Sequence, residues 1–214
     1  MESVCLLRTV AEELELLRSW QQGDAAAGRT LVERHFKSVY RFFVNKVPSQ
    51  AADLVQETFL ACIEGQARFR GASSFRTYVF AIARRRLYRY WRDNKGDHAT
   101  ELSVAELVAQ AGCPADALAI HQEQKLLLRG LRKLPLETQI LLELAYFEGF
   151  TDRELAELED IPVGTLKSRL RKARATLADA MSTIASGALL ESTTHDLDGW
   201  IRGIRERLAQ RAPG

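Results

Sequence analysis

Long apolar runs are missing from this chain. No segment approaches the roughly 18 to 20 uninterrupted apolar residues that a membrane-spanning helix needs. The first residues, 1–17, contain four glutamates rather than the basic and apolar stretches of a cleavable export signal. We therefore expect a cytoplasmic protein. Its 214 residues, 46% of them hydrophobic, are enough to bury the cores of two small domains.

Cysteine is scarce as well. Cys5, Cys62 and Cys113 lie far apart, with no C-x-x-C pair and no histidine cluster at zinc-ligand spacing. Neither a disulfide framework nor a metal site is therefore indicated, and we expect no metal and no cofactor. Cys62 falls on an apolar helical face, which favours a packing role. The chain also lacks a glycine-rich phosphate loop, a catalytic triad and a carboxylate cluster, so we expect that it is not an enzyme.

Alternating β-branched segments, the sign of strands, are absent too, and the periodic segments have helical spacing. The sequence therefore predicts an all-α fold. A first helix should end near Gly23, a second should begin after Asp24 as its cap, and a third should follow Pro48 and Ser49. A long fourth helix, capped by Ser73 or Ser74, should reach about residue 92. The buried stripe of the second helix is expected to consist of Val32, Phe36, Val39 and Phe43.

The domain boundaries follow from composition. Residues 1–95 should form one helical domain, 96–122 a flexible acidic linker, and 123–182 a second, four-helix domain. Residues 183–214 should be a C-terminal helical extension that packs on its own protein; the alternative is a regulatory segment that docks a partner or covers a DNA-binding surface. Its apolar stripe consists of Leu197, Trp200, Ile201, Ile204 and Leu208.

Charge is distributed in blocks, although the net charge is only +2. Residues 68–95 contain nine basic residues against one acid, and residues 161–178 contain five against none. Between them, residues 96–124 contain five acids and no base, and residues 136–160 contain eight acids and one base. Two basic segments in acidic surroundings indicate two separate contacts with a polyanion.

The second basic segment has the layout of a helix-turn-helix. Thr151 and Glu154 form a capping box that opens a short helix, a turn follows at residues 159–161, and Pro162 suits the first position of a longer helix that reaches about Met181. An apolar face should pack against the preceding helices, and a basic face should enter the major groove. The alternative is an ordinary solvated basic face. The candidate DNA-binding residues are Thr165, Lys167, Ser168, Arg169, Arg171, Lys172 and Arg174.

The first basic segment mixes arginine with aromatic residues. Arginines follow a phosphate backbone while aromatic rings stack on unpaired bases, a combination suited to single-stranded or melting DNA. Some of the aromatic residues should belong to the core, and we expect at least one of Tyr88, Tyr90 and Trp91 to be buried. The candidate DNA-binding residues are Arg84, Arg85, Arg86, Tyr88, Arg89, Trp91 and Arg92.

The third predicted helix has two distinct faces. An apolar face should point inward and is expected to consist of Leu54, Val55, Phe59, Cys62 and Ile63. The other face is mostly acidic with one exposed leucine, and it is either a solvated surface or a protein interface. It consists of Asp53, Gln56, Glu57, Leu60 and Glu64.

Three segments carry a resemblance to a known family: DLVQETFLACIEG, FRGASSFRTYVFAIARRR, and LPLETQILLELAYFEGFTDRELAELEDIPVGTLKSRLRKARATL. Together they resemble the two domains of an extracytoplasmic-function (group four) bacterial RNA polymerase sigma factor. The resemblance implies a protein that directs the polymerase to promoters and assists their opening. It also implies contacts with the clamp and flap regions of core polymerase, and control by an anti-sigma protein.

The resemblance gives each candidate surface a role. It implies clamp binding through Asp53, Gln56, Glu57 and Leu60, recognition and melting of the minus-ten element by the arginine and aromatic helix, and reading of the minus-thirty-five element by the last basic helix. Arg85 and Arg89 stand where the family often has Asn and Asp, so the minus-ten preference is not implied. Two alternatives remain open: a stand-alone helix-turn-helix regulator of duplex operators, and an RNA-binding or structural protein.

Overall fold

The computed structural model describes residues 2–69, 71, 73–94 and 126–184, together with positions 199, 201 and 203. Every regular element in these ranges is a helix, which confirms the all-α prediction. The chain divides into two compact units, Met1–Thr100 and Glu101–Gly214. The boundaries inferred from composition stay a prediction, because residues 95–125 lie outside the described ranges.

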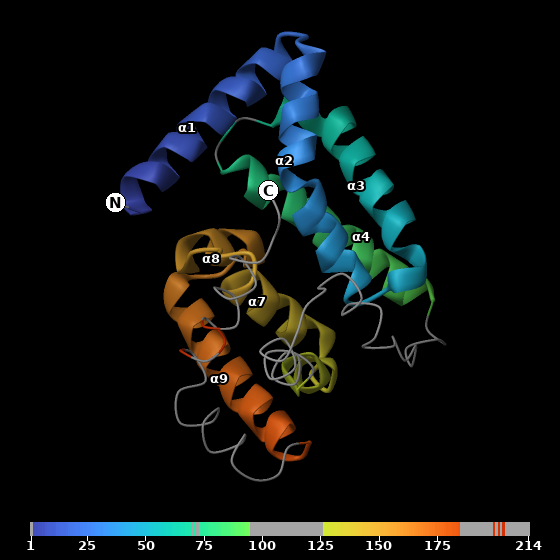
Figure 1. The fold of residues 1–214 in the computed structure, drawn as a ribbon, viewed down its shortest axis with the longest axis vertical. Helices are drawn as coiled ribbons and strands as arrows, with labels where there is room; N and C mark the ends of the chain where they lie inside the picture. Colours follow the sequence, from blue (N-terminus) through green and yellow to red (C-terminus); the bar gives the residue numbers. More distant parts are fainter. Residues whose placement is uncertain are drawn as a thin grey trace, which may run out of the picture. The chain divides into compact units, whose positions relative to one another are not determined.

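Unit 1 is built from four helices. Figure 1 shows α1 and α2 as a hairpin, α3 on the other side of α2, and α4 passing behind α2 and α3. Short 3-10 turns at Pro48–Gln50 and Gln66–Arg68 flank α3, so the predicted break before the third helix is confirmed. The four helices are α1 (Glu2–Gln21), α2 (Ala25–Val44), α3 (Ala51–Gly65) and α4 (Phe75–Asp93).

Side-chain caps fix where two of these helices begin. Asp24 accepts hydrogen bonds from the backbone N–H of Ala26 and Ala27, at 2.9 and 3.2 Å, as predicted from its type and position. Ser74, rather than Ser73, caps α4, since its hydroxyl accepts from the N–H of Thr77 at 3.1 Å.

The buried face of α2 is rotated from the predicted one. Val39 and Phe43 are buried as expected, but Val32 is half-buried and the Phe36 side chain is exposed, so that part of the prediction is wrong. Because α2 contacts α1, α3 and α4, it needs a wider inward surface than a single stripe supplies. The residues of α2 that are buried are Ala27, Gly28, Leu31, His35, Val39, Phe42 and Phe43.

The contacts that His35 and Gly28 make with neighbouring helices accompany this rotation. The His35 ring nitrogen lies 3.1 Å from a carboxylate oxygen of Glu13 on α1, and its ring centroid lies 5.5 Å from that of Phe75 on α4. Gly28 lies directly against the Trp20 indole, where a Cβ atom would overlap the ring nitrogen. A residue larger than glycine would therefore push α1 and α2 apart.

The inward face of α3 is close to the prediction. Leu54, Val55, Phe59 and Cys62 are buried, whereas Ile63 is 47% exposed, so its placement in the core was wrong. Burial raises the pKa of the Cys62 thiol to about 12, which keeps it protonated at neutral pH. A buried, protonated thiol fits the predicted packing role.

Unit 2 contains a helix at residues 126–132, then α7 (Leu136–Tyr146), α8 (Asp152–Glu159) and α9 (Val163–Ser182). Pro135 and Pro162 precede α7 and α9 as caps, so α9 begins one residue later than predicted. Between these helices lies a core in which leucine is the most frequent residue. Its fully buried side chains include Leu127, Ile140, Leu142, Leu144, Leu155 and Leu166.

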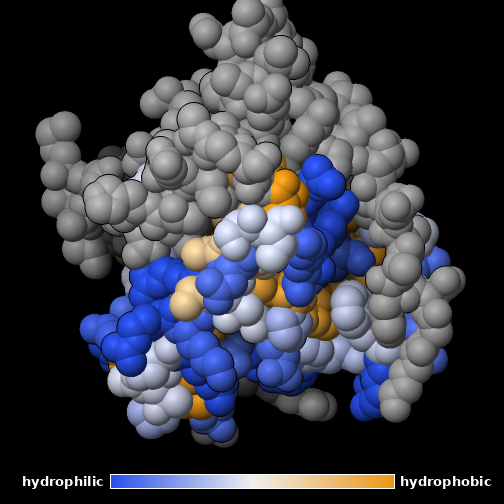
Figure 2. All heavy atoms as spheres, turned by 90° about the horizontal axis from the view of Figure 1, so that it is seen from below, coloured by the Kyte–Doolittle hydropathy of each residue, from blue (hydrophilic) through white to orange (hydrophobic). Residues whose placement is uncertain are grey.

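Apolar residues are largely turned inward in the described part of the chain. On the face in Figure 2, hydrophobic residues are interspersed with hydrophilic ones. No helix of the described residues is long and apolar enough to cross a membrane. Of the predicted C-terminal stripe, Ile201 is 1% exposed, and the other four members lie outside the described residues.

Candidate nucleic-acid interface

The capping box that opens α8 is formed as predicted. The backbone N–H of Glu154 donates to the Thr151 hydroxyl at 3.2 Å, and the N–H of Thr151 donates to the Glu154 carboxylate at 2.8 Å. Two backbone donors at the start of the helix are thereby satisfied. This fixes the first residue of α8 and therefore the length of the helix before the turn.

The turn between α8 and α9 depends on one left-handed residue. Asp160 has φ 54° and ψ 47°, and its N–H bonds to the carbonyls of Ala156 and Glu157. The N–H of Ile161 also bonds to the Ala156 carbonyl, at 3.0 Å. Aspartate adopts this conformation more readily than most residues. The chain then passes through three residues and enters α9, as the helix-turn-helix prediction requires.

The two predicted faces of α9 are both present. Leu166, Leu170, Ala173 and Leu177 are buried against unit 2, as their spacing predicted. Most of the candidate DNA-binding residues are exposed and only Arg174 is half-buried. The exposed ones are Thr165, Lys167, Ser168, Arg169, Arg171 and Lys172. The structure thus brings all seven candidates together on one helix.

Three of these seven side chains have a partner within unit 2. Lys167 lies 3.9 Å from the Asp152 carboxylate, and Arg169 lies 3.8 Å from that of Glu159. Arg174 donates to the Tyr146 hydroxyl at 3.3 Å. The partners lie on α7 and α8, so no spacing within α9 indicated them.

The fourth helix of unit 1, α4, has an exposed basic stripe opposite its core. Phe80, Ala83 and Leu87 are fully buried. Arg85, Arg89 and Arg92 recur at i, i+4 and i+7 on the far side, and all three are exposed. These three candidate residues are therefore accessible to a nucleic acid along one line, although the Arg92 Nε also donates to the neighbouring Asp93 carboxylate at 3.2 Å.

Aromatic residues border this stripe on one flank. Arg84, Tyr88 and Trp91 recur at i, i+4 and i+7 and are half-buried. The Arg84 guanidinium carbon lies 5.8 Å from the centroid of the Tyr88 ring, within cation–π range. Tyr90 is also half-buried, so the expectation that one of the three aromatic residues would be buried is wrong.

The seventh candidate on α4 faces elsewhere. Arg86 lies on the other flank of the helix, next to α3, where its Nη1 donates to the Glu57 carboxylate at 3.2 Å. The seven residues selected from sequence therefore share one helix but do not share one face.

The outward face of α3 is exposed as predicted. Asp53, Gln56, Glu57 and Leu60 all face solvent, with Leu60 49% exposed. The four side chains recur at helical spacing, so they present one continuous surface. Ile63 extends this surface toward the end of the helix.

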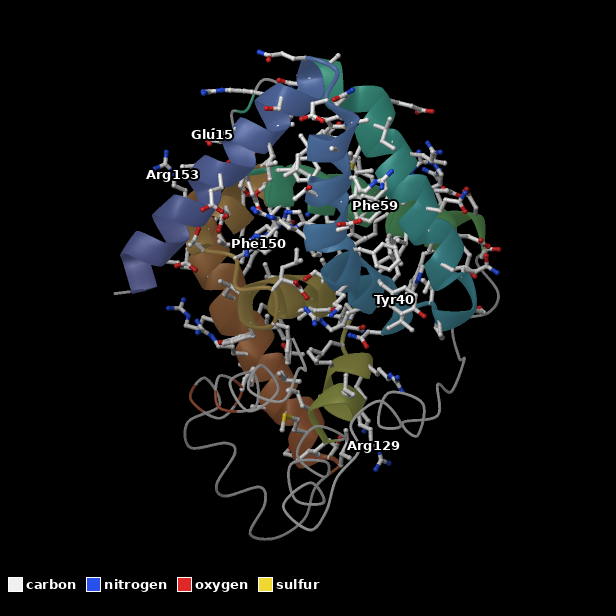
Figure 3. All side chains as sticks on the ribbon, turned by 45° about the horizontal axis from the view of Figure 1, so that its top comes forward. Glu15, Tyr40, Phe59, Arg129, Phe150 and Arg153 are labelled. Carbon is white, nitrogen blue, oxygen red and sulfur yellow. The ribbon has the colours of Figure 1, made fainter. Side chains whose placement is uncertain are left out.

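Sequence reasoning missed an aromatic surface beside this face. The Phe36 ring on α2 stacks between Tyr40, with centroids 6.3 Å apart, and Phe59 of α3, at 6.2 Å. Tyr40 and Phe59 are labelled in Figure 3, on the neighbouring helices α2 and α3. Phe36 and Tyr40 are 46% and 39% exposed. Only the pairing of α2 with α3 places these residues next to the exposed face of α3.

Metal binding has no support in the described part of the chain. No three side chains of the ligand-forming types His, Cys, Asp and Glu come together there as a group that could hold an ion. The interfaces described above consist of charged, polar and aromatic side chains, together with the exposed aliphatic residues Leu60 and Ile63 of α3.

Comparison with known families identifies the class of protein. Residues 31–96 match the family described as Sigma-70 region 2, and residues 124–177 match Sigma-70, region 4. The two matches cover more than half of the chain; the first includes α4 and the second includes most of α9, up to residue 177. The chain belongs to the sigma-70 family, whose members are non-enzymatic transcription initiation factors.

Curated relatives narrow this class. The chain is 27% identical to the ECF RNA polymerase sigma-E factor of Haemophilus influenzae over 178 residues, covering 77% of this chain and 94% of the relative. It is also 27% identical to the ECF RNA polymerase sigma-E factor of Escherichia coli over 169 residues, which covers 74% of this chain and 88% of that relative. The protein is an extracytoplasmic-function sigma factor of group four, which directs RNA polymerase to promoters. The stand-alone regulator is not favoured.

Two solved structures share the fold. CnrH, solved in complex with the cytosolic domain of CnrY, has a TM-score of 0.62 at 19% identity and covers 81% of this chain and 99% of its own. The sigma factor RpoE of Bartonella quintana, solved with the anti-sigma factor NepR, has a TM-score of 0.53 at 22% identity. The match covers 72% of this chain and 96% of the RpoE chain.

Proposed function

We propose that this sigma factor divides promoter recognition between its two basic helices. α9 binds the duplex minus-thirty-five element in the major groove, and α4 captures the non-template strand of the minus-ten element as it separates. The observation that carries the proposal is the difference in the neighbours of the exposed basic residues: aromatic side chains on α4, and only aliphatic or polar ones on α9.

On α4, the exposed arginines supply phosphate contacts and the adjacent aromatic flank supplies stacking. Stacking of a base on an aromatic ring contributes about 1–3 kcal/mol, similar to the cost of unstacking a base step. Tyr88 and Trp91 are half-buried, so each keeps part of its ring accessible while the rest anchors it to unit 1. Rings held in this way lose little entropy when a base stacks on them.

On α9, the leading turns present the residues that contact base edges. Arg171 and Lys172 are exposed and form no ion pair with the described residues. Arginine bonds guanine through two parallel hydrogen bonds, which distinguishes it from the other bases. We assign base reading to Arg171 and neighbouring Ser168, and phosphate binding to Lys172.

The outward face of α3 and the aromatic surface beside it form the polymerase-binding region of this proposal. Its acidic residues suit a basic surface on the clamp, and Leu60 with Phe36 and Tyr40 provides apolar area that becomes buried on binding. The same kind of surface suits an anti-sigma protein, the partner named for the Bartonella quintana relative. We propose that the protein works in the cytoplasm, associates with the nucleoid when bound to polymerase, and leaves nucleotide chemistry to the polymerase.

The test is run-off transcription with core RNA polymerase and the purified full-length chain on genomic promoters. Adding the chain is expected to produce new transcripts that core enzyme alone does not make. Promoter binding by the chain alone should be weak and should tighten when core enzyme is added. Tight, specific operator binding without polymerase, and no added initiation, would overturn the proposal and favour the stand-alone regulator.

A further inference from the structure

Glu57 and Arg86 belong to two different proposed interfaces, yet they form an ion pair with each other. Glu57 is one of the proposed polymerase-binding residues on α3, and Arg86 is one of the proposed minus-ten residues on α4. Arg86 Nη1 donates to Glu57 Oε2 at 3.2 Å. Among the described candidate residues of unit 1, this is the ion pair that joins the two interfaces.

The position of Arg86 on α4 explains why its side chain does not lie on the basic stripe. It lies on the α3 flank, while Arg89, three residues later, lies on the exposed stripe. Residues at i and i+3 of a helix have Cβ atoms about 5–6 Å apart. A change of rotamer is therefore enough to carry the Arg86 guanidinium to the phosphates that Arg89 contacts, and no helix has to move.

The ion pair is also accessible enough to be exchanged. The side chains of Glu57 and Arg86 are 51% and 27% exposed. Partly exposed pairs are weak because solvent screens them and because both long side chains lose entropy. A cation of the polymerase that approaches Glu57 competes directly with Arg86 for the same carboxylate.

We propose that the Glu57–Arg86 ion pair is a latch that couples polymerase binding to DNA binding. In the free protein, Glu57 holds Arg86 away from the DNA-binding stripe. When polymerase engages Glu57, Arg86 is released and adds one phosphate contact to the minus-ten interface. This inference rests on the proposed function, because it needs α3 to meet polymerase and α4 to meet DNA.

The test measures how salt changes the affinity of the full-length free protein for a fluorescein-labelled single-stranded oligonucleotide of mixed sequence. Each phosphate contact to a single strand changes the slope of log K against log salt by about 0.7. Glu57→Gln is expected to steepen this slope by that amount, because Arg86 is released. In an Arg86→Ala background the same substitution should leave the slope unchanged.

Glu64→Gln is the matched control, because Glu64 is exposed on the same helix and the described residues offer it no ion pair. It removes the same charge without releasing an arginine. Equal effects of Glu57→Gln and Glu64→Gln would mean that only long-range repulsion changed, and the latch would be rejected. Circular dichroism of each variant is the control for folding.

The second arm uses holoenzyme assembled with core polymerase. Here Arg86→Ala is expected to flatten the salt slope by about 0.7, whereas in the free wild-type chain it should change little. No change in holoenzyme would show that Arg86 never reaches DNA. Run-off transcription by the wild-type chain is measured on the same preparation. Intact transcription with no effect of Arg86→Ala would reject the latch alone, whereas absence of transcription would reject the proposed function.

Discussion

The two basic helices differ less in charge than in what accompanies the charge. α4 has 19 residues and α9 has 20, and each is amphipathic with arginines on its outer face. α4 places Tyr88 and Trp91 beside that face, whereas α9 contains no aromatic residue at all. Arginine alone binds phosphate in any nucleic acid, so the neighbouring residues decide which form of DNA is bound.

The two helices also differ in how their ends are presented. α9 begins at a tight turn after Asp160, so its leading residues project from unit 2. α4 begins within unit 1, where Phe75 is buried, and its basic part is the C-terminal half. An exposed helix N-terminus suits insertion into a groove, and an exposed helix side suits an extended strand. Four experiments test the two helices and the units that hold them.

The largest effects should come from the two cores. Leu87 and Leu166 are both fully buried, one in each unit. Leu87→Ala and Leu166→Ala are each expected to lower the free energy of unfolding by about 2–5 kcal/mol. Urea unfolding should show each variant shifting the transition of its own unit. One shared transition that both variants shift equally would contradict separate folding of the units.

Removing the aromatic flank of α4 should separate strand capture from initial binding. The double variant Tyr88→Ala, Trp91→Ala is expected to weaken promoter opening by about 1–3 kcal/mol for each stacked base lost. Permanganate reactivity of unpaired thymines measures opening, and binding at low temperature measures the closed complex. Tyr90→Ala, on the opposite flank, is the control and should have less effect. Equal losses at both steps would contradict strand capture.

On α9, Arg171→Ala should change sequence preference and not only affinity. Loss of a bidentate contact is expected to cost about 1–3 kcal/mol of discrimination at one position of the upstream element. Competition among single-base variants of that element measures this. Arg129→Ala is the control, since Arg129 lines a cavity with Thr183 at the far end of α9. A uniform loss for every sequence would identify Arg171 as a phosphate contact.

The smallest effect concerns the cap that positions α8. Thr151→Ala is expected to destabilise unit 2 by about 0.5–2 kcal/mol, since the N–H of Glu154 loses its acceptor. Thermal unfolding measures the loss, and Thr151→Ser, which keeps the hydroxyl, should retain most of the stability. If both variants lose the same stability, the methyl group matters more than the cap, and the capping argument is wrong.

Local signals made much of this structure predictable. Asp24 and the pair Thr151 and Glu154 act within three residues of themselves, so their roles could be read from spacing. The buried stripe of α9 was correct because that helix turns a single face to unit 2. The corresponding stripe of α2 was partly wrong, since Phe36 is exposed and His35 is buried. A helix with three neighbours has several inward directions, and periodicity alone does not choose among them.

The sequence by itself determined the helical class, the two basic segments and the residue types that could meet DNA, because helical periodicity and charge are local properties. Only the tertiary structure decided that Arg86 bonds Glu57 and that Phe36 stacks on Phe59. Both contacts join different helices, and their partners are separated by more than 20 residues of chain. Which side chains meet across such a distance depends on how the helices pack, and no spacing along the chain encodes it.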